Sequence, residues 1–471
     1  MWTHFTPAKH CIASLVALAL VLASCGLFST GRISEAAQAA AAAGRPNVLI
    51  ILTDDQRIGT MDVMPATLRR FADQGTTFSN AFATTPLCCP SRSSIFTGRY
   101  AHNHGVQSNA RHAPDSLDEE TTIQRYLQEA GYRTALFGKY LNLWPVASDP
   151  PHFDRWAITS PGHNATGYVG GTWNVEGTVR TVDQYSTDFI AEEGVRFITG
   201  QESTDGQPWF LELAVYAPHL RAVPEAEFAD APVPRFHANP AVRESDRSDK
   251  PPYVRREKPA RIAGIETTHR RVLRTLMSVD DLAARIFRTL AATDELDHTL
   301  AFFLSDNGFL WGEHGLKAKT HAYEPSIRIP FYMRWPGNVH PGSVDERFVA
   351  NIDIAPTILA AVGVPQDPAT PMDGRSLLDP AWTRDRILTE FWRLQHVETP
   401  SWASLRTAAY HYVEYYRPEW TVAFREYYDL TADPWELTNL LHDGDPGNDP
   451  ALAPLRAQLA ADRACAGLNC P

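Results

Sequence analysis

Short runs of consecutive apolar residues alternate with stretches of helical periodicity along most of the chain. The runs at 47–52, 133–137, 209–216 and 299–304 have the length and composition of buried strands. Apolar positions recur with a helical period over 266–292, which predicts a long helix. Strands that alternate with helices are typical of an α/β domain.

A shorter helix is expected before the strand at 133–137. Ser116 and Glu119 have the spacing of a capping box. The apolar residues that follow keep the helical period as far as Gly131, which suits a helix end. The pattern predicts a helix that begins close to Ser116.

Two later segments depart from the alternation. Residues 218–262 are rich in Pro, Arg, Asp and Glu and show little periodicity, which predicts a long loop of the kind that is usually functional. The stretches at 410–416 and 423–428 are aromatic and strand-like. We therefore expect a main α/β domain over 46–383 and a smaller antiparallel-sheet subdomain with a final helix over 384–471.

The first residues predict export. The apolar run at 11–23 follows Lys9 and His10 and is too short to span a bilayer comfortably. Leu22-Ala23-Ser24-Cys25 resembles a bacterial lipobox, so we expect a lipoprotein-type signal peptide at 1–24 and a lipidated Cys25. Ordinary cleavage, here or near the alanine run that follows, is the alternative.

Residues 25–45 are rich in alanine and lack a hydrophobic pattern, which predicts a tether. No later apolar run reaches about 18 residues, the length that a membrane span needs. We expect a cell-surface lipoprotein or a secreted protein that meets the membrane only through a lipid anchor.

Composition and charge narrow the class of protein. The 471 residues are 44% hydrophobic and 21% charged, which excludes a disordered tail, a collagen-like rod and a disulfide-stapled miniprotein. The formal charge of −12 argues against general nucleic-acid binding, and an anionic substrate would need a local cationic pocket. The six cysteines form no zinc pattern. Export favours a Cys465–Cys470 disulfide, with two free thiols as the alternative.

Polar side chains directly follow the four expected strands: Asp54, Asp55, Lys139, His219, Asp306 and Asn307. Ligands bind at the carboxyl ends of strands in open α/β sheets. The three aspartates and the asparagine offer oxygen ligands, which suit Ca²⁺ or Mg²⁺. A turn or helix-capping role is the alternative for any one aspartate alone.

A second group of residues surrounds Cys88. In Cys88-Cys89-Pro90-Ser91-Arg92, the proline suits the first turn of a helix, and Gly98 suits its end. Cys88 would lie just ahead of the helix N-terminus, where free N–H groups favour an anion. The thiol is then an activated or modified nucleophile, or alternatively a small buried hydrophobic residue.

This segment, with Thr97-Gly98-Arg99, resembles the C-x-P-S-R…T-G-R signature of the sulfatase family in the alkaline-phosphatase-like superfamily. The resemblance extends from Pro46 to about Leu441 and implies a central mixed sheet flanked by helices. It also implies that a formylglycine-generating enzyme oxidises Cys88 to Cα-formylglycine, whose hydrate is the nucleophile.

The resemblance assigns roles to the residues after the strands. It implies a calcium ion, with Mg²⁺ less favoured, bound by Asp54, Asp55, Asp306, Asn307 and the modified Cys88. Arg92 would hold the formylglycine, and the sulfate-binding residues would be Lys139, His219 and Lys319. Lys319 is placed by the run at 319–330, which resembles the family pattern K-x-x-x-Y-E-x-S-I-R-x-P.

One position departs from many arylsulfatases, which carry a histidine two residues after the Gly-Lys pair. Here that position is Leu141, and this version, together with the run at 248–255, resembles the N-acetylglucosamine-6-sulfatase branch. His321 is a candidate for the missing imidazole, with an ordinary loop histidine as the alternative. We expect His102 and His104 to be structural.

The resemblance predicts a hydrolase of sulfate esters, with sulfated sugars similar to N-acetylglucosamine 6-sulfate as substrates, and the leader segment predicts that it is exported. A phosphonate or phosphate ester hydrolase of the same superfamily is one alternative. A glycan-binding lipoprotein without catalysis is the other.

Overall fold

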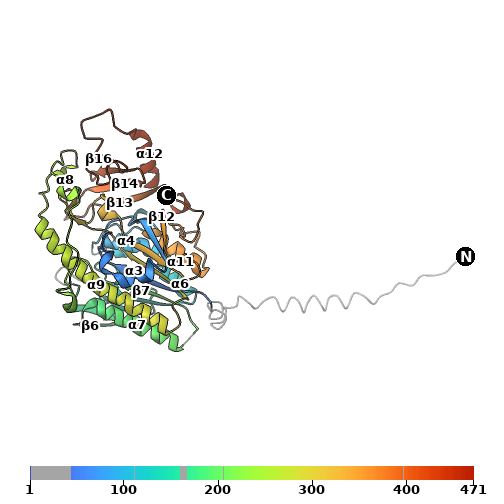
Figure 1. Cartoon of the computed structure of the whole chain (residues 1–471). Coiled ribbons are helices and arrows are strands. Elements are labelled where there is room, and N and C mark those ends of the chain that lie inside the picture. The colour runs from blue at the N-terminus through green and yellow to red at the C-terminus, as the bar shows by residue number, and fades with distance from the viewer. Residues whose placement is uncertain (2–43, 111, 160–166, 205, 396) are drawn as a thin grey trace.

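The computed structural model describes residue 1 and residues 44–471, apart from 111, 160–166, 205 and 396 (Figure 1). The expected signal peptide, the expected lipidation site Cys25 and nearly all of the expected tether lie outside the described residues. Within the described part of the chain, no helix is both long enough and apolar enough to cross a membrane.

A mixed sheet of ten strands forms the centre of the molecule, in the order β12-β2-β11-β8-β1-β7-β3-β4-β5-β6. The strands are β1 Asn47–Thr53, β2 Thr76–Phe82, β3 Arg133–Lys139, β4 Arg155–Thr159, β5 Gly171–Val175, β6 Thr178–Val182, β7 Trp209–Ala214, β8 Thr299–Ser305, β11 Phe331–Arg334 and β12 Ser343–Ala350. The central strands β8, β1, β7, β3 and β4 run parallel to one another. The four strands expected from the apolar runs are confirmed, although β7 ends two residues early, at Ala214.

Helices cover both faces of the sheet (Figure 1). One face carries α3 Pro65–Phe71, α7 Ser186–Thr204 and α9 Ile262–Ala292, and the other carries α4 Cys88–Thr97, α6 Ile123–Glu129 and α11 Ile354–Val362. The expected long helix is α9, which begins four residues earlier than its periodic pattern. Buried strand side chains that alternate between the two faces supply one hydrophobic core beneath each layer of helices.

The helix expected to begin close to Ser116 begins instead at Ile123. Ser116 ends a short 3-10 turn, and Asp118 caps the next turn by accepting a hydrogen bond from the Glu120 amide. The Glu119 carboxylate accepts a hydrogen bond from the Tyr140 hydroxyl, which is a long-range contact that local spacing does not reveal.

A separate antiparallel sheet forms most of the C-terminal region: β13 Arg386–Phe391, β14 Ser401–Thr407, β15 Tyr410–Tyr416 and β16 Val422–Asp429. The final helix is α12 Leu452–Asp462. This arrangement confirms the expected fold class, whereas the domain boundaries remain predictions. The expected disulfide between Cys465 and Cys470 is formed.

Candidate functional site

The parallel register of the sheet brings the polar strand ends together. β1 pairs with β8 on one side and with β7 on the other, so Asp54, Asp306 and the loop to His219 meet at one edge. Backbone bonds continue the alignment beyond the strands: the Asp54 amide donates to the Ala217 carbonyl at 3.1 Å, and the Asp306 amide donates to the Thr53 carbonyl at 3.0 Å.

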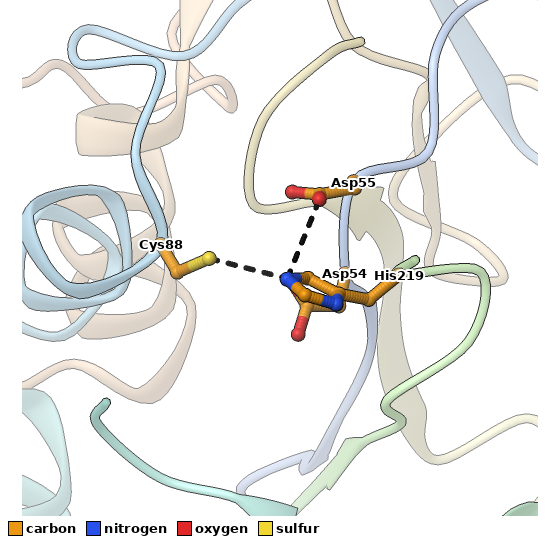
Figure 2. Close-up of side chains that lie close together, drawn as sticks. All are labelled: Asp54, Asp55, Cys88 and His219. Carbon is orange, nitrogen blue, oxygen red and sulfur yellow. Dashed lines mark hydrogen bonds and ion pairs between the residues drawn. The ribbon is translucent and has the colours of Figure 1, made fainter. Parts of the chain in front are cut away.

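Cys88 faces this edge from the first residue of α4 (Figure 2). Its Sγ atom lies 3.4 Å from Asp54 Oδ1 and 2.6 Å from Lys319 Nζ. One side-chain donor atom from each of Asp54, Asp55, Cys88 and His219 lies within 4.8 Å of the others. The signature cysteine is therefore buried among charged groups and not among apolar side chains alone.

Asp306 and Asn307, which directly follow β8, contact this group. Asp306 Oδ1 accepts a hydrogen bond from the Asp55 amide at 3.1 Å, and Asn307 Nδ2 donates to Asp55 Oδ1 at 2.7 Å. Both side chains are fully buried. Asp306 and Asn307, two of the five residues expected as calcium ligands, are thus hydrogen-bonded to a third, Asp55.

Three cationic side chains balance the three carboxylates. Arg92 donates from Nε to Asp306 Oδ2 at 2.9 Å and from Nη1 to the Lys139 carbonyl at 2.7 Å. Lys139 Nζ donates to Asp54 Oδ2 at 2.5 Å, and Lys319 Nζ contacts Asp55 Oδ1. The cationic side chains that the acidic chain would need for an anionic ligand therefore gather at this edge, each paired with a carboxylate.

Burial and neighbouring charges shift the pKa values of Asp54 and Cys88 in opposite directions. Burial alone would raise the pKa of Asp54, but Lys139, His219, Arg92 and Lys319 outweigh it and lower that pKa well below its usual range. Burial and the Asp54 carboxylate raise the pKa of the Cys88 thiol to about 12. An unmodified Cys88 is therefore held as a neutral thiol, not as the thiolate that nucleophilic attack needs.

The donor set fits a hard divalent cation. Carboxylate oxygens of Asp54, Asp55 and Asp306 and the amide oxygen of Asn307 are the ligand types that Ca²⁺ and Mg²⁺ prefer. The two lysine ammonium groups already lie against Asp54 and Asp55, so these carboxylates sit where positive charge is favoured. The His219 ring, which we expected to bind sulfate, lies in the same group, with Nε2 3.6 Å from Asp55 Oδ2.

Tyr216 is a residue of this site that sequence reasoning missed. Its ring packs against the His219 ring at 4.8 Å between centroids, and Lys139 Nζ lies 6.0 Å from the Tyr216 centroid. Tyr216 ends the apolar run 209–216, so its tyrosine hydroxyl at the last position was the available signal. Asn109 is a second such residue, because its Oδ1 atom accepts a hydrogen bond from the Cys89 amide at 2.9 Å.

The other three histidines considered from the sequence contact residues other than Cys88. His321 is buried, and its Nδ1 atom lies 3.2 Å from Thr399 Oγ1. His102 lies 2.9 Å from Glu390, and His104 lies 3.1 Å from Ser94 Oγ. Leu141 is fully buried within the hydrophobic core beneath α4 and α6.

Comparisons with known proteins agree with the geometry. Residues 46–364 match the family model described as Sulfatase, and residues 312–464 match one described as N-sulphoglucosamine sulphohydrolase, C-terminal. The chain is 30% identical to human N-acetylglucosamine-6-sulfatase over 96% of this chain and 89% of that protein. It is 35% identical to the extracellular sulfatase SULF-1 homolog of Drosophila melanogaster over 74% of this chain.

The chain spans less than half of the length of the first curated relatives that it matches, and 32% of the Drosophila protein. Among solved structures, one described as being in complex with its substrate D-glucosamine-2-N,6-O-disulfate superposes with a TM-score of 0.77. It is 24% identical and covers 88% of this chain and 97% of its own. That likeness supports the fold.

Proposed function

The chain belongs to the sulfatase family, and from that membership we propose that it hydrolyses the sulfate esters of sugars. The observation that carries the proposal is the position of Cys88, the first cysteine of the family signature, within 3.4 Å of Asp54 and 2.6 Å of Lys319. Sugars similar to N-acetylglucosamine 6-sulfate are the proposed substrates, because the human relative at 30% identity carries that activity in its name.

Formylglycine made from Cys88 by a formylglycine-generating enzyme would supply a geminal diol, and a calcium ion held by Asp54, Asp55, Asp306 and Asn307 would polarise sulfate oxygens. The chain's own residues supply the positioning. Arg92 donates hydrogen bonds to the Asp306 carboxylate and to the Lys139 carbonyl, and so holds these two residues in position. Lys139 and Lys319 present ammonium groups that stabilise negative charge on sulfate oxygens.

His219 is the proposed donor of a proton to the leaving sugar oxygen. Its Nδ1 atom lies 2.6 Å from the Leu220 carbonyl, so Nδ1 carries a hydrogen in either charge state. Only the protonated ring then also carries a hydrogen on Nε2, the nitrogen on the Asp55 side. Lys319 is the second candidate donor because its ammonium group lies beside Cys88.

A panel of defined substrates tests the proposal. Sulfate release is measured from sugars sulfated at single positions, with p-nitrophenyl sulfate and p-nitrophenyl phosphate alongside and Cys88→Ala as the inactive control. We expect a 6-sulfated amino sugar to give the highest kcat/KM. Faster turnover of the phosphate ester than of every sulfate would favour a phosphate or phosphonate hydrolase, and no turnover of any ester would favour a glycan-binding protein.

Modification and export need their own measurements. The tryptic peptide 71–92 from protein made in its native host should carry an aldehyde in place of the Cys88 thiol; a peptide that carries only cysteine would refute the modification. We also propose an exported lipoprotein, on the grounds of the apolar run at 11–23 and the lipobox-like Cys25. Labelling with a radioactive fatty acid should mark the parent protein and not Cys25→Ala.

A further inference from the structure

The segment 255–271 concentrates positive charge on an acidic protein. It holds two acidic residues and six basic ones, and all six basic residues are exposed: Arg255, Arg256, Lys258, Arg261, Arg270 and Arg271. We call these six residues the basic strip. The strip spans α8 Pro252–Arg255, the connection that follows and the first turns of α9. It includes the end of the long loop 218–262, whose first residues carry His219 into the site but whose end contributes no residue to it.

The charge of the strip is largely unneutralised. Arg256 Nη2 lies 2.9 Å from Glu398 Oε2, and both side chains are exposed. None of the other five basic residues has an ion-pair partner within 4.0 Å among the residues that the structure describes. Since exposed ion pairs contribute little to stability, the strip is a poor candidate for a purely stabilising feature.

The strip lies at the same edge of the sheet as Cys88. Helix α9 ends at Ala292, shortly before β8 begins at Thr299, so its first turns lie toward the carboxyl ends of the strands. Figure 1 shows α8 and the start of α9 on one side of the molecule.

Close backbone packing links the strip to the segment that carries Lys319. A Cβ atom on Gly312 would come within 2.7 Å of the Ala260 Cβ atom, and one on Gly315 would come within 3.1 Å of the Lys258 carbonyl oxygen. Both glycines have positive φ, so the chain can turn there without a side chain in the way. Lys319 follows Gly315 by four residues.

A second set of contacts connects the chain beside Asp55 to the same turn at 312–315. Arg57 follows Asp55 by two residues, donates from Nη1 to Glu313 Oε1 at 2.9 Å and lies over the Trp311 ring. Glu313 lies between Gly312 and Gly315, the two glycines that pack against Ala260 and the backbone at Lys258. Contacts through Arg57 and Glu313 therefore connect Asp55 to the turn that packs against the backbone at Lys258.

We propose that the basic strip binds additional anionic groups of a polyanionic glycan while one of its sulfate esters occupies the Cys88 site. The inference rests on the proposed function and defines its substrate class as a chain of several charged sugars. Exposed guanidinium and ammonium groups recognise sulfate and carboxylate groups through charge-assisted hydrogen bonds. Positive charge beside a site also raises the local concentration of an anionic substrate.

Two triple variants of equal charge test the proposal. The strip variant is Lys258→Gln/Arg261→Gln/Arg271→Gln. The control is Arg69→Gln/Arg288→Gln/Arg456→Gln, which removes three exposed cations elsewhere, one of them at the far end of α9. Each is assayed on N-acetylglucosamine 6-sulfate and on a polysulfated octasaccharide that ends in that sugar, at low and high salt.

We expect the strip variant to lose about 10-fold in kcat/KM on the octasaccharide at low salt, mainly through KM, and less than 2-fold on the monosaccharide. High salt should remove most of the difference. An equal loss in both triple variants, or no loss in either, would overturn the proposal.

Binding without turnover separates this inference from the proposed function. Octasaccharide affinity is measured by titration in the Cys88→Ala background with and without the strip substitutions. Weaker binding only with the strip substitutions supports the inference even if no ester is hydrolysed. Strip substitutions that leave this affinity unchanged but reduce cosedimentation with vesicles of anionic phospholipid would overturn it in favour of a membrane surface.

Discussion

The Nζ atom of Lys319 lies 2.6 Å from the Sγ atom of Cys88, and the same ammonium group contacts Asp55. This contact joins two residues 231 positions apart in the sequence. It places the signature cysteine between a cation and a cluster of carboxylates. A polar group in place of the thiol would therefore have charged side chains as hydrogen-bond partners. The first prediction follows from that position.

Cys88→Ala should lower sulfate release by at least about 1,000-fold, because the substitution removes the precursor of the nucleophile. Stability should change little, since the side chain lost is small. Cys89→Ala is the matched control: Cys89 is also a fully buried thiol in the first turn of α4, but its neighbours are core residues. Equal loss of activity in both variants, measured beside thermal unfolding, would contradict the assignment.

Lys139→Met should destabilise the protein by about 3 kcal/mol, because it leaves the fully buried Asp54 carboxylate without its ammonium partner at 2.5 Å. Urea unfolding in the presence of a chelator measures the loss. Adding Asp54→Asn to Lys139→Met should recover part of the stability, since no buried charge is then left uncompensated. Strictly additive losses would show that the two side chains do not interact.

Calcium should raise the midpoint of thermal unfolding, because an ion that binds only the folded chain stabilises it by mass action, about 2.7 kcal/mol at 100 times Kd. A chelator should reverse the rise, and Asp55→Asn should weaken it. Mg²⁺ should give a smaller shift, since it demands tighter octahedral geometry. A larger shift with Zn²⁺ than with Ca²⁺ would refute the oxygen-ligand assignment.

The sequence predicted which polar side chains the structure brings together better than it predicted the strands of the sheet. Apolar runs that end in Asp54-Asp55 or Asp306-Asn307 identify both a buried strand and its chemically active end, because parallel strands share one carboxyl edge. The outer strands β4–β6 and β12 have exposed or mixed side chains. Strand β12 pairs with the distant strand β2, whereas β5 and β6 form a hairpin at the edge of the sheet. Their local pattern was too weak to predict them.

The sequence also could not predict the surroundings of individual side chains. Glu212 is the single charged residue of the apolar run 209–216, which predicts a buried strand but does not reveal the surroundings of this carboxylate. The structure buries β7 on both faces, and Glu212 is fully buried on the face beneath α4. Neither of its carboxylate oxygens has a hydrogen-bond partner among the described residues. Only the tertiary packing of the sheet reveals this environment.

The pH dependence of stability should report on Glu212. Burial raises the pKa of this carboxyl from 4.5 to about 7, and Arg92 only partly opposes the rise. Between these two values the folded chain keeps a proton that the unfolded chain has lost. The free energy of unfolding therefore falls as the pH rises through this window, by about 3 kcal/mol in total.

Glu212→Gln removes that dependence, because the amide stays neutral at every pH. The difference in unfolding free energy, variant minus parent, should therefore grow by about 3 kcal/mol in favour of the variant between pH 4 and pH 8. Urea unfolding followed by tryptophan fluorescence at several pH values measures it, with the exposed Glu346→Gln as the control. A difference that stays constant across the range for Glu212→Gln would mean that this carboxyl is ionised in the folded protein at the same pH as in the unfolded chain.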